Sequence, residues 1–214
     1  MATEVDSRIT AVLALYDAQG KTEYFGEKVT KTDHMVQAAQ SAEAEGESER
    51  VVLACLLHDI GHLLERDDMN GLGVRDHARV GAEYLRSMGM DKLVCDLVEH
   101  HAEAKRYLVA TRAGYLGHLS RASRRTLLYQ GGRMSRVECE RFEGLPCFRG
   151  AVQVRLHDDR AKETDLPTRN VASYVPLIRK FLSPSVPLPL GPRAARALAE
   201  TAPSRTQLPQ ETSS

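Results

Sequence analysis

The amino-acid sequence predicts an all-α protein, a helical bundle arranged around one buried central helix. Apolar residues recur at helical spacing through most of the first 182 positions, and no stretch alternates at the period of two that marks a half-buried strand. Residues 51–60 (VVLACLLHDI) are apolar nearly all round, which indicates a helix enclosed by other helices. This segment carries the adjacent pair His58 and Asp59 near its end.

The other helices follow from the same spacing. Residues 9–18 place four apolar side chains on one face, and residues 31–45 combine Ala, Gln and Glu with apolar positions at helical intervals. Gly61 is expected to end the central helix. Further helices are expected at residues 76–88, 91–101, 120–129, part of 136–142, 148–162 and 170–181. The Gly-containing segments 66–74 and 130–132 are either lid or phosphate-binding turns or plain connectors.

Length and composition limit the classes of function. The 214 residues suffice for one domain, and 29 basic against 29 acidic side chains leave no overall charge to attract nucleic acid. No apolar run approaches the roughly 20 residues that cross a bilayer, and the N-terminus lacks a signal-like segment, so we expect a cytoplasmic protein without a membrane partner. Six of the nine prolines follow residue 183, which predicts a domain at residues 1–182 and a disordered tail at 183–214.

Residues with metal-binding side chains recur along the chain. In order they are His34, His58, Asp59, His77, His101 and Asp158. Four imidazoles and two carboxylates, with no thiolate, suit iron or manganese better than a structural zinc. A single catalytic ion normally keeps three or four protein ligands, so this surplus predicts two metals that share a carboxylate, about 3.5–4 Å apart.

Several longer motifs surround these residues. They are YFGEKVTKTDHMVQAAQ, HDIGH, DHARVGAEYL, HHAEAKRYL, SRASRRTLLYQGG and DDRAK, in that order. In these segments the chain resembles the HD-domain superfamily and, within it, the mixed-valence diiron oxygenases of the PhnZ type, which cleave organophosphonates. A more distant likeness is to myo-inositol oxygenase. The resemblance extends over nearly all of the expected domain.

The resemblance implies an HD-domain fold with two iron ions in the mixed-valence Fe(II)/Fe(III) state and dioxygen as co-substrate. Asp59 would bridge the two ions. The first iron would also be held by His34, His58 and Asp158, and the second by His77 and His101. The implied reaction cleaves the C–P bond of a 1-hydroxyphosphonate such as (R)-1-hydroxy-2-aminoethylphosphonate, or its trimethylammonio analogue, to phosphate and a carboxylic acid such as glycine. A 2-oxoglutarate-dependent hydroxylase would make this substrate.

Other residues are expected to serve the substrate. A permanently cationic Lys105, one turn after His101, can meet a phosphonate oxygen, and His62 lies one turn beyond the first ligand of the HD pair. Further donors are expected from Ser123, Gln130 and Arg155. The alternatives are a solvated helix face for Lys105 and a helix cap for Ser123.

Tyr24 and Glu27 precede the first metal-binding helix in a segment without helical or strand pattern. The resemblance implies that the tyrosine occupies a position on one iron until substrate displaces it, with the glutamate as its partner. The alternative is an ordinary surface loop.

Two other functions remain open. A metal-dependent HD phosphohydrolase acting on a phosphate ester would need chiefly His34, His58, Asp59 and Asp158. Simple hydrolysis has less need for the second pair of histidines, which favours the oxygenase. A non-enzymatic HD module for sensing or interaction could lose ligands, whereas this chain retains all of them.

Overall fold

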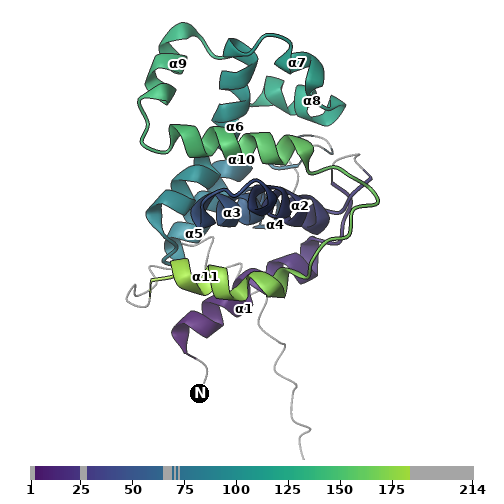
Figure 1. The fold of residues 1–214 in the computed structure, drawn as a ribbon, viewed down its shortest axis with the longest axis vertical. Helices are drawn as coiled ribbons and strands as arrows, with labels where there is room; N and C mark the ends of the chain where they lie inside the picture. Colours follow the sequence, from purple (N-terminus) through teal and green to yellow (C-terminus); the bar gives the residue numbers. More distant parts are fainter. Residues whose placement is uncertain (1–2, 25–27, 65–68, 70, 72, 184–214) are drawn as a thin grey trace, which may run out of the picture.

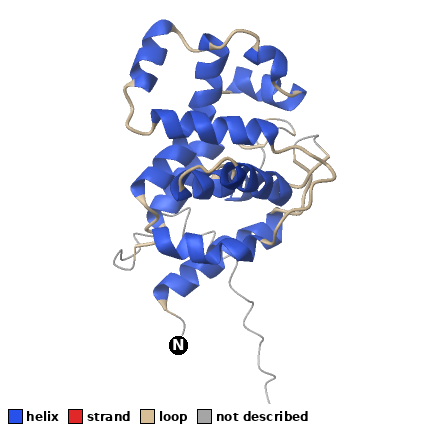
Figure 2. Cartoon of the chain, in the orientation of Figure 1, coloured by secondary structure: helices blue, strands red, loops and turns tan. Residues whose placement is uncertain are grey.

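The computed structural model describes residues 3–24, 28–64, 69, 71 and 73–183. Over these ranges the regular elements are helices, accompanied by two isolated β-bridges, so the all-α prediction is confirmed (Figure 2). The elements are α1 (Glu4–Gln19), α2 (Lys31–Ala44), α3 (Glu49–Leu57), α4 (Gly61–Leu64), α5 (His77–Ser87), α6 (Lys92–Thr111), α7 (Tyr115–His118), α8 (Arg121–Tyr129), α9 (Arg136–Glu143), α10 (Phe148–Arg160), the 3₁₀ helix η1 (Val171–Tyr174) and α11 (Val175–Phe181).

Helix α3 lies in the middle of the molecule, as its apolar sequence predicts. It packs against α2, α6 and α10, and α10 crosses between this inner group and the outer part formed by α7, α8 and α9 (Figure 1). Leu53, Leu56 and Leu57 have no exposed surface. Full burial of a leucine side chain contributes about 1.5–3 kcal/mol, so this helix anchors the core on which the polar residues at its end depend.

The HD pair occupies a turn between two helices. Helix α3 ends at Leu57, and His58 and Asp59 lie in the turn before α4 begins at Gly61. The prediction that Gly61 ends the helix is therefore wrong, because the residue begins the next one. A Cβ at this position would lie 2.0 Å from the carbonyl oxygen of His77, so only glycine permits this close approach of α4 to α5.

Other boundaries also differ from the prediction. Helix α6 continues to Thr111, well beyond the expected end at His101, because good helix formers follow and Leu108 is buried. The expected helix at residues 170–181 is divided into η1 and α11, with Pro176 in the first turn of α11, where its missing N–H costs nothing. Helix α7 was not expected, and its four residues are too few to show a periodic pattern.

Some expectations lie outside the described residues. These include the role of Glu27, most of the 66–74 segment and the tail beyond residue 183, so the domain boundary stays a prediction. Within the part that the structure describes, no helix has both the length and the apolar character required to cross a bilayer.

Candidate metal centre

Five separate parts of the fold bring the six expected ligands to one place. They are His34 on α2, His58 and Asp59 in the turn after α3, His77 at the start of α5, His101 on α6 and Asp158 on α10. All six are buried, and none exposes more than 5% of its surface. Buried charged and polar groups need partners, so a cluster of this kind requires an electrostatic explanation.

The four imidazoles are all oriented in the same way. Each ring has its Nδ1 atom 2.7–3.0 Å from a backbone carbonyl oxygen. The acceptors for His34, His58, His77 and His101 are the carbonyl oxygens of Ala161, Cys55, Val74 and Val98. Because a carbonyl can only accept, Nδ1 carries the hydrogen in each neutral ring and the lone pair of Nε2 faces the centre.

The first group of ligand atoms gathers around the pair His34 and His58. Their Nε2 atoms are 3.1 Å apart, and Asp158 Oδ1 lies 3.3 Å from the first of them. Asp59 Oδ2 is 3.5 Å from His58 Nε2. Two nitrogen lone pairs at this separation cannot hydrogen bond, and neither carboxylate oxygen has a hydrogen-bond partner among the described residues. A cation among these four atoms would satisfy all of them.

The second group gathers around His77 and His101. Their Nε2 atoms are 3.2 Å apart, and Asp59 Oδ1 lies 3.3 Å from the first and 3.6 Å from the second. Ligand atoms at right angles and about 2.0–2.2 Å from one ion are about 3 Å from one another, so both groups have the spacing that a metal requires. The two oxygens of Asp59 are divided between the groups, as in a bridging carboxylate.

Protonation states in the centre favour metal binding. Burial lowers the pKa of both His58 and His77 to about 4, so these rings are neutral at physiological pH. Burial opposes the ionisation of Asp158, but the adjacent Arg155 guanidinium holds the pKa of this carboxyl well below its ordinary range. Neutral imidazoles and ionised carboxylates are the forms that coordinate a metal.

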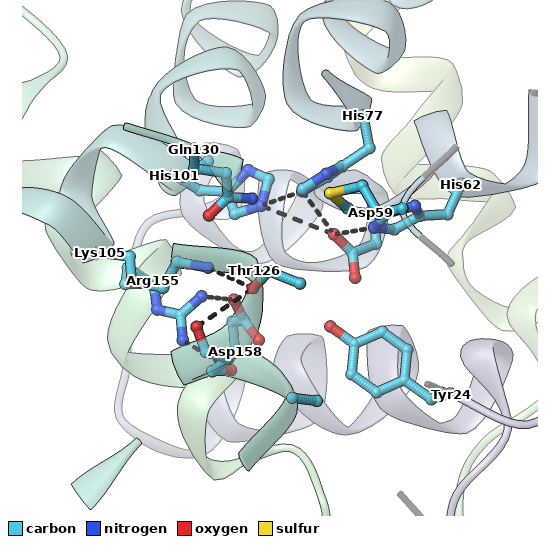
Figure 3. A pocket seen from close by; sticks show the side chains of 14 residues that line it. Tyr24, Asp59, His62, His77, His101, Lys105, Thr126, Gln130, Arg155 and Asp158 are labelled. Carbon is cyan, nitrogen blue, oxygen red and sulfur yellow. Dashed lines mark hydrogen bonds and ion pairs between the residues drawn. The ribbon is translucent and has the colours of Figure 1, made fainter. Parts of the chain in front are cut away.

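A pocket lies beside the two groups, and Figure 3 shows its lining. The expected substrate residues all contribute to it, namely His62, Lys105, Ser123, Gln130 and Arg155, together with Tyr24. Thr126 and Met69 also line the pocket and were not expected. Thr126 follows Ser123 by one turn of α8, a helical spacing that could have indicated it.

Lys105 on α6 lines the pocket. It exposes only 2% of its surface, and its Nζ donates to Thr126 Oγ1 at 2.9 Å. The alternative of a solvated helix face is therefore wrong. Burial, reinforced by Arg155, lowers the pKa of Lys105 to about 7, so the description of a permanently cationic lysine is also wrong.

Comparison with known proteins places this centre in a family. The HD domain model matches residues 32–133, which contain five of the six candidate ligands. An uncharacterized protein of Acanthamoeba polyphaga mimivirus is 37% identical over 186 residues, 85% of each chain. A 1-hydroxy-2-(trimethylamino)ethylphosphonate dioxygenase (glycine-betaine-forming) of Leisingera caerulea is 36% identical over 78% of this chain and 87% of its own. A hydroxymethylphosphonate dioxygenase of Gimesia maris is 37% identical over 78% of this chain and 84% of its own.

The chain belongs to the HD-domain oxygenases that cleave phosphonates. Members of this family are enzymes, so the non-enzymatic alternative is excluded. Asp158 lies on α10, beyond the segment that the HD domain model covers.

In this HD-domain oxygenase, His62 differs from the four ring ligands in its tautomer. Its Nδ1 accepts a hydrogen bond from the backbone N–H of Val74 at 3.0 Å, so Nε2 carries the hydrogen. The ring stacks on His77 with centroids 4.0 Å apart. A protonated Nε2 cannot bind a metal, and it presents a donor to the pocket instead.

Tyr24 lies against the first group. Its ring stacks on His34 with centroids 3.8 Å apart, and its hydroxyl points into the pocket toward Asp59 (Figure 3). Burial and the neighbouring carboxylates raise the pKa of this phenol well above its ordinary value. This placement does not fit the alternative of an ordinary surface loop.

The other residues expected to donate to the substrate are Arg155, Ser123 and Gln130, and they differ in the hydrogen bonds that they already make. Arg155 donates to Asp158 Oδ2 at 2.6 Å and to Asp159, and its contact with Ser123 Oγ is long at 3.5 Å. Ser123 is not a helix cap, because Ser120 caps α8 and accepts from the Ser123 backbone N–H. Gln130 Oε1 is buried without a hydrogen-bond partner in the described part of the chain.

Proposed function

We propose that the chain is a diiron oxygenase that uses dioxygen to cleave the C–P bond of a 1-hydroxyphosphonate. The products are phosphate and a carboxylic acid. Suitable substrates are 1-hydroxy-2-aminoethylphosphonate and its trimethylammonio analogue. The observation that carries the proposal is the division of Asp59, whose Oδ1 faces one pair of histidines and whose Oδ2 faces the other. The activities named for the Leisingera and Gimesia relatives support the substrate class.

The two groups fit two irons that share Asp59. The first ion would be held by His34, His58, Asp59 and Asp158, and the second by Asp59, His77 and His101. The ligands are nitrogen and oxygen donors without sulfur, a set suited to iron. When bound, a mixed-valence Fe(II)/Fe(III) pair supplies redox capacity and open coordination positions for substrate and dioxygen.

The protein's part in the reaction begins with the phosphonate. Lys105, Thr126 and Ser123 bring one amine and two hydroxyl groups to the pocket. A phosphonate dianion near Lys105 favours the ammonium form, so Nζ takes up a proton as substrate binds. This charge-assisted contact orients the C1 atom toward the metal groups.

Other side chains control protons and access. His62 holds a hydrogen on Nε2 and directs it into the pocket, where the substrate's oxygen atoms can accept it. Tyr24 covers the first group from the opposite side through its contact with His34. The metal-binding side chains expose at most 5% of their surface, and this burial limits the water that reaches the reacting atoms, which protects the oxidation from side reactions.

The substrate also implies a preceding reaction. A phosphonate with hydrogens at C1 must receive a hydroxyl there before this enzyme can act, which is the chemistry of a 2-oxoglutarate-dependent hydroxylase. We propose such an enzyme as the functional partner.

The test is a comparison of 1-hydroxyphosphonates with phosphate monoesters on protein reconstituted anaerobically with iron. The expected result is about one phosphate released per dioxygen consumed with the hydroxyphosphonates, and no phosphate from the esters. With the hydroxyphosphonates, His77→Ala should lose both phosphate release and dioxygen uptake. His118→Ala, a matched change of an exposed histidine on α7, should keep both. Phosphate release from esters without dioxygen uptake would instead establish the phosphohydrolase.

A further inference from the structure

A closed set of hydrogen bonds lies behind Asp158. Arg155 exposes only 3% of its surface, and its Nη1 donates to Asp158 Oδ2 at 2.6 Å. Its Nη2 donates to Asp159 Oδ1, and its Nε donates to the hydroxyl of Tyr115 at 3.2 Å. Tyr115 in turn donates its only hydroxyl hydrogen to Asp159 Oδ2. Arg155, Asp159 and Tyr115 therefore form a ring of hydrogen bonds, which we call the guanidinium ring.

The helical spacing of α10 makes this arrangement possible. Asp158 and Asp159 are neighbours, so their side chains leave the helix about 100° apart. Arg155 precedes them by three and four residues, which places its guanidinium between the two carboxylates. One carboxylate consequently faces the metal groups and the other faces α7. Figure 3 shows the guanidinium beside Asp158 on the pocket wall.

The guanidinium ring decides which oxygen of Asp158 is offered to the metal. Oδ2 is held by Arg155, whereas Oδ1 has no hydrogen-bond partner among the described residues and lies 3.3 Å from His34 Nε2. A carboxylate held at one oxygen cannot rotate to present both. Partners of this kind orient metal ligands and tune their donor strength.

The negative charge of Asp159 affects how strongly Asp158 attracts a cation. Arg155 carries one positive charge and lies between two carboxylates, so the trio retains one negative charge, which Asp158 directs to the first group. Without the charge of Asp159, the guanidinium would neutralise Asp158 alone and weaken its attraction for a cation. Tyr115 is 5% exposed, and burial raises the pKa of its phenol, so it remains a donor.

We propose that Asp159 and Tyr115 are positioning residues for the metal centre, acting through Arg155 on Asp158. They set the position and the effective charge of the Asp158 carboxylate at the first group. Neither residue touches the metal or the substrate in this role. The inference rests on the proposed function only in taking Asp158 as a ligand.

The experiment titrates metal-free protein with Co(II) alone under anaerobic conditions, in competition with a chromophoric chelator. Asp159→Asn should weaken one of the two binding steps about tenfold and leave the other unchanged. Tyr115→Phe, which keeps the ring that packs with Leu108 and Leu119, should weaken the same step to a smaller extent. Asp159→Glu, which retains the charge, should recover most of the affinity.

Three comparisons separate positioning from a general structural effect. Tyr107→Phe removes a similar hydroxyl–carboxylate bond, 2.7 Å to Glu143 on another face, and should change neither step. The double variant of Tyr115 and Asp159 should bind no more weakly than Asp159→Asn, because both changes break the same ring. The loss should persist in a His101→Ala background, which keeps the first group, and disappear in a His34→Ala background.

The inference is overturned if both variants bind two equivalents of Co(II) as tightly as the parent. It is also overturned if both steps weaken equally and the metal-free protein melts at a lower temperature. A parent protein that binds no Co(II) would overturn the proposed function as well. Unchanged variants of a parent that binds two ions would overturn the positioning role alone.

Discussion

Replacing Lys105 by methionine should make the protein more stable and less active at the same time. The substitution keeps an unbranched side chain of similar length and removes the buried ammonium. In the metal-free protein, burial has moved the pKa of this lysine from an ordinary 10.5 to about 7. Since one pKa unit corresponds to about 1.4 kcal/mol, burial disfavours the charged form by roughly 5 kcal/mol.

The sign of the stability change follows from this shift. The unfolded lysine stays protonated up to about pH 10.5, whereas the folded one loses its proton near pH 7. At neutral pH the buried Lys105 therefore lowers the free energy of unfolding, because the unfolded chain binds its proton more tightly. Methionine removes that penalty and loses the hydrogen bond to Thr126. With about 1 kcal/mol lost with that hydrogen bond, the net gain is about 4 kcal/mol, which would raise the melting temperature by about 8–16 °C in a chain of this size.

Activity should change in the opposite direction. Loss of a charge-assisted contact to a partly desolvated phosphonate costs about 1.5–3 kcal/mol, or roughly 10-fold to 150-fold in kcat/KM. The measurements are thermal unfolding of the metal-free protein and steady-state kinetics with iron content checked in each sample. A methionine variant that melts below the parent and keeps its kcat/KM would refute the assignment of Lys105 to a buried anion site.

Three further outcomes are expected. By elemental analysis, His101→Ala should bind one metal ion fewer than the parent, and its helical circular dichroism should be retained. His100→Ala is the matched control, because the His100 ring bonds Glu103, and this variant should bind as much metal as the parent. Equal metal content in the two variants would contradict the assignment of His101 to a second metal site. Tyr24→Phe should lack a visible phenolate-to-Fe(III) absorption that the oxidised parent shows and that substrate abolishes anaerobically; a parent without the band would leave Tyr24 off the metal. Apparent KM for the phosphonate should rise as pH increases through about 7, because Lys105 loses its charge there, while Lys105→Arg should lack this rise; coincident profiles would disprove the link.

Much of the fold was accessible from the sequence because helix formation depends on local spacing. The apolar run of residues 51–60 predicts a central helix, and that helix is buried at every apolar position. The extension of α6 beyond His101 was missed, although residues 102–111 (AEAKRYLVAT) include good helix formers such as Ala and Leu. Its consequence is functional, since the same rigid helix carries both His101 and Lys105.

The candidate ligands were also accessible, because their residue types, order and motifs are properties of the chain itself. Their arrangement was not. The orientation of the His34 ring depends on the carbonyl of Ala161, and the division of the Asp59 oxygens depends on four helices meeting at one turn. Thus the sequence alone determined which side chains can bind metal, and local geometry orients three of the four rings, whose Nδ1 atoms face carbonyl oxygens three residues earlier. Tertiary structure decided the orientation of His34 and brought the six ligands together, because contacts between distant segments arise only when those segments pack.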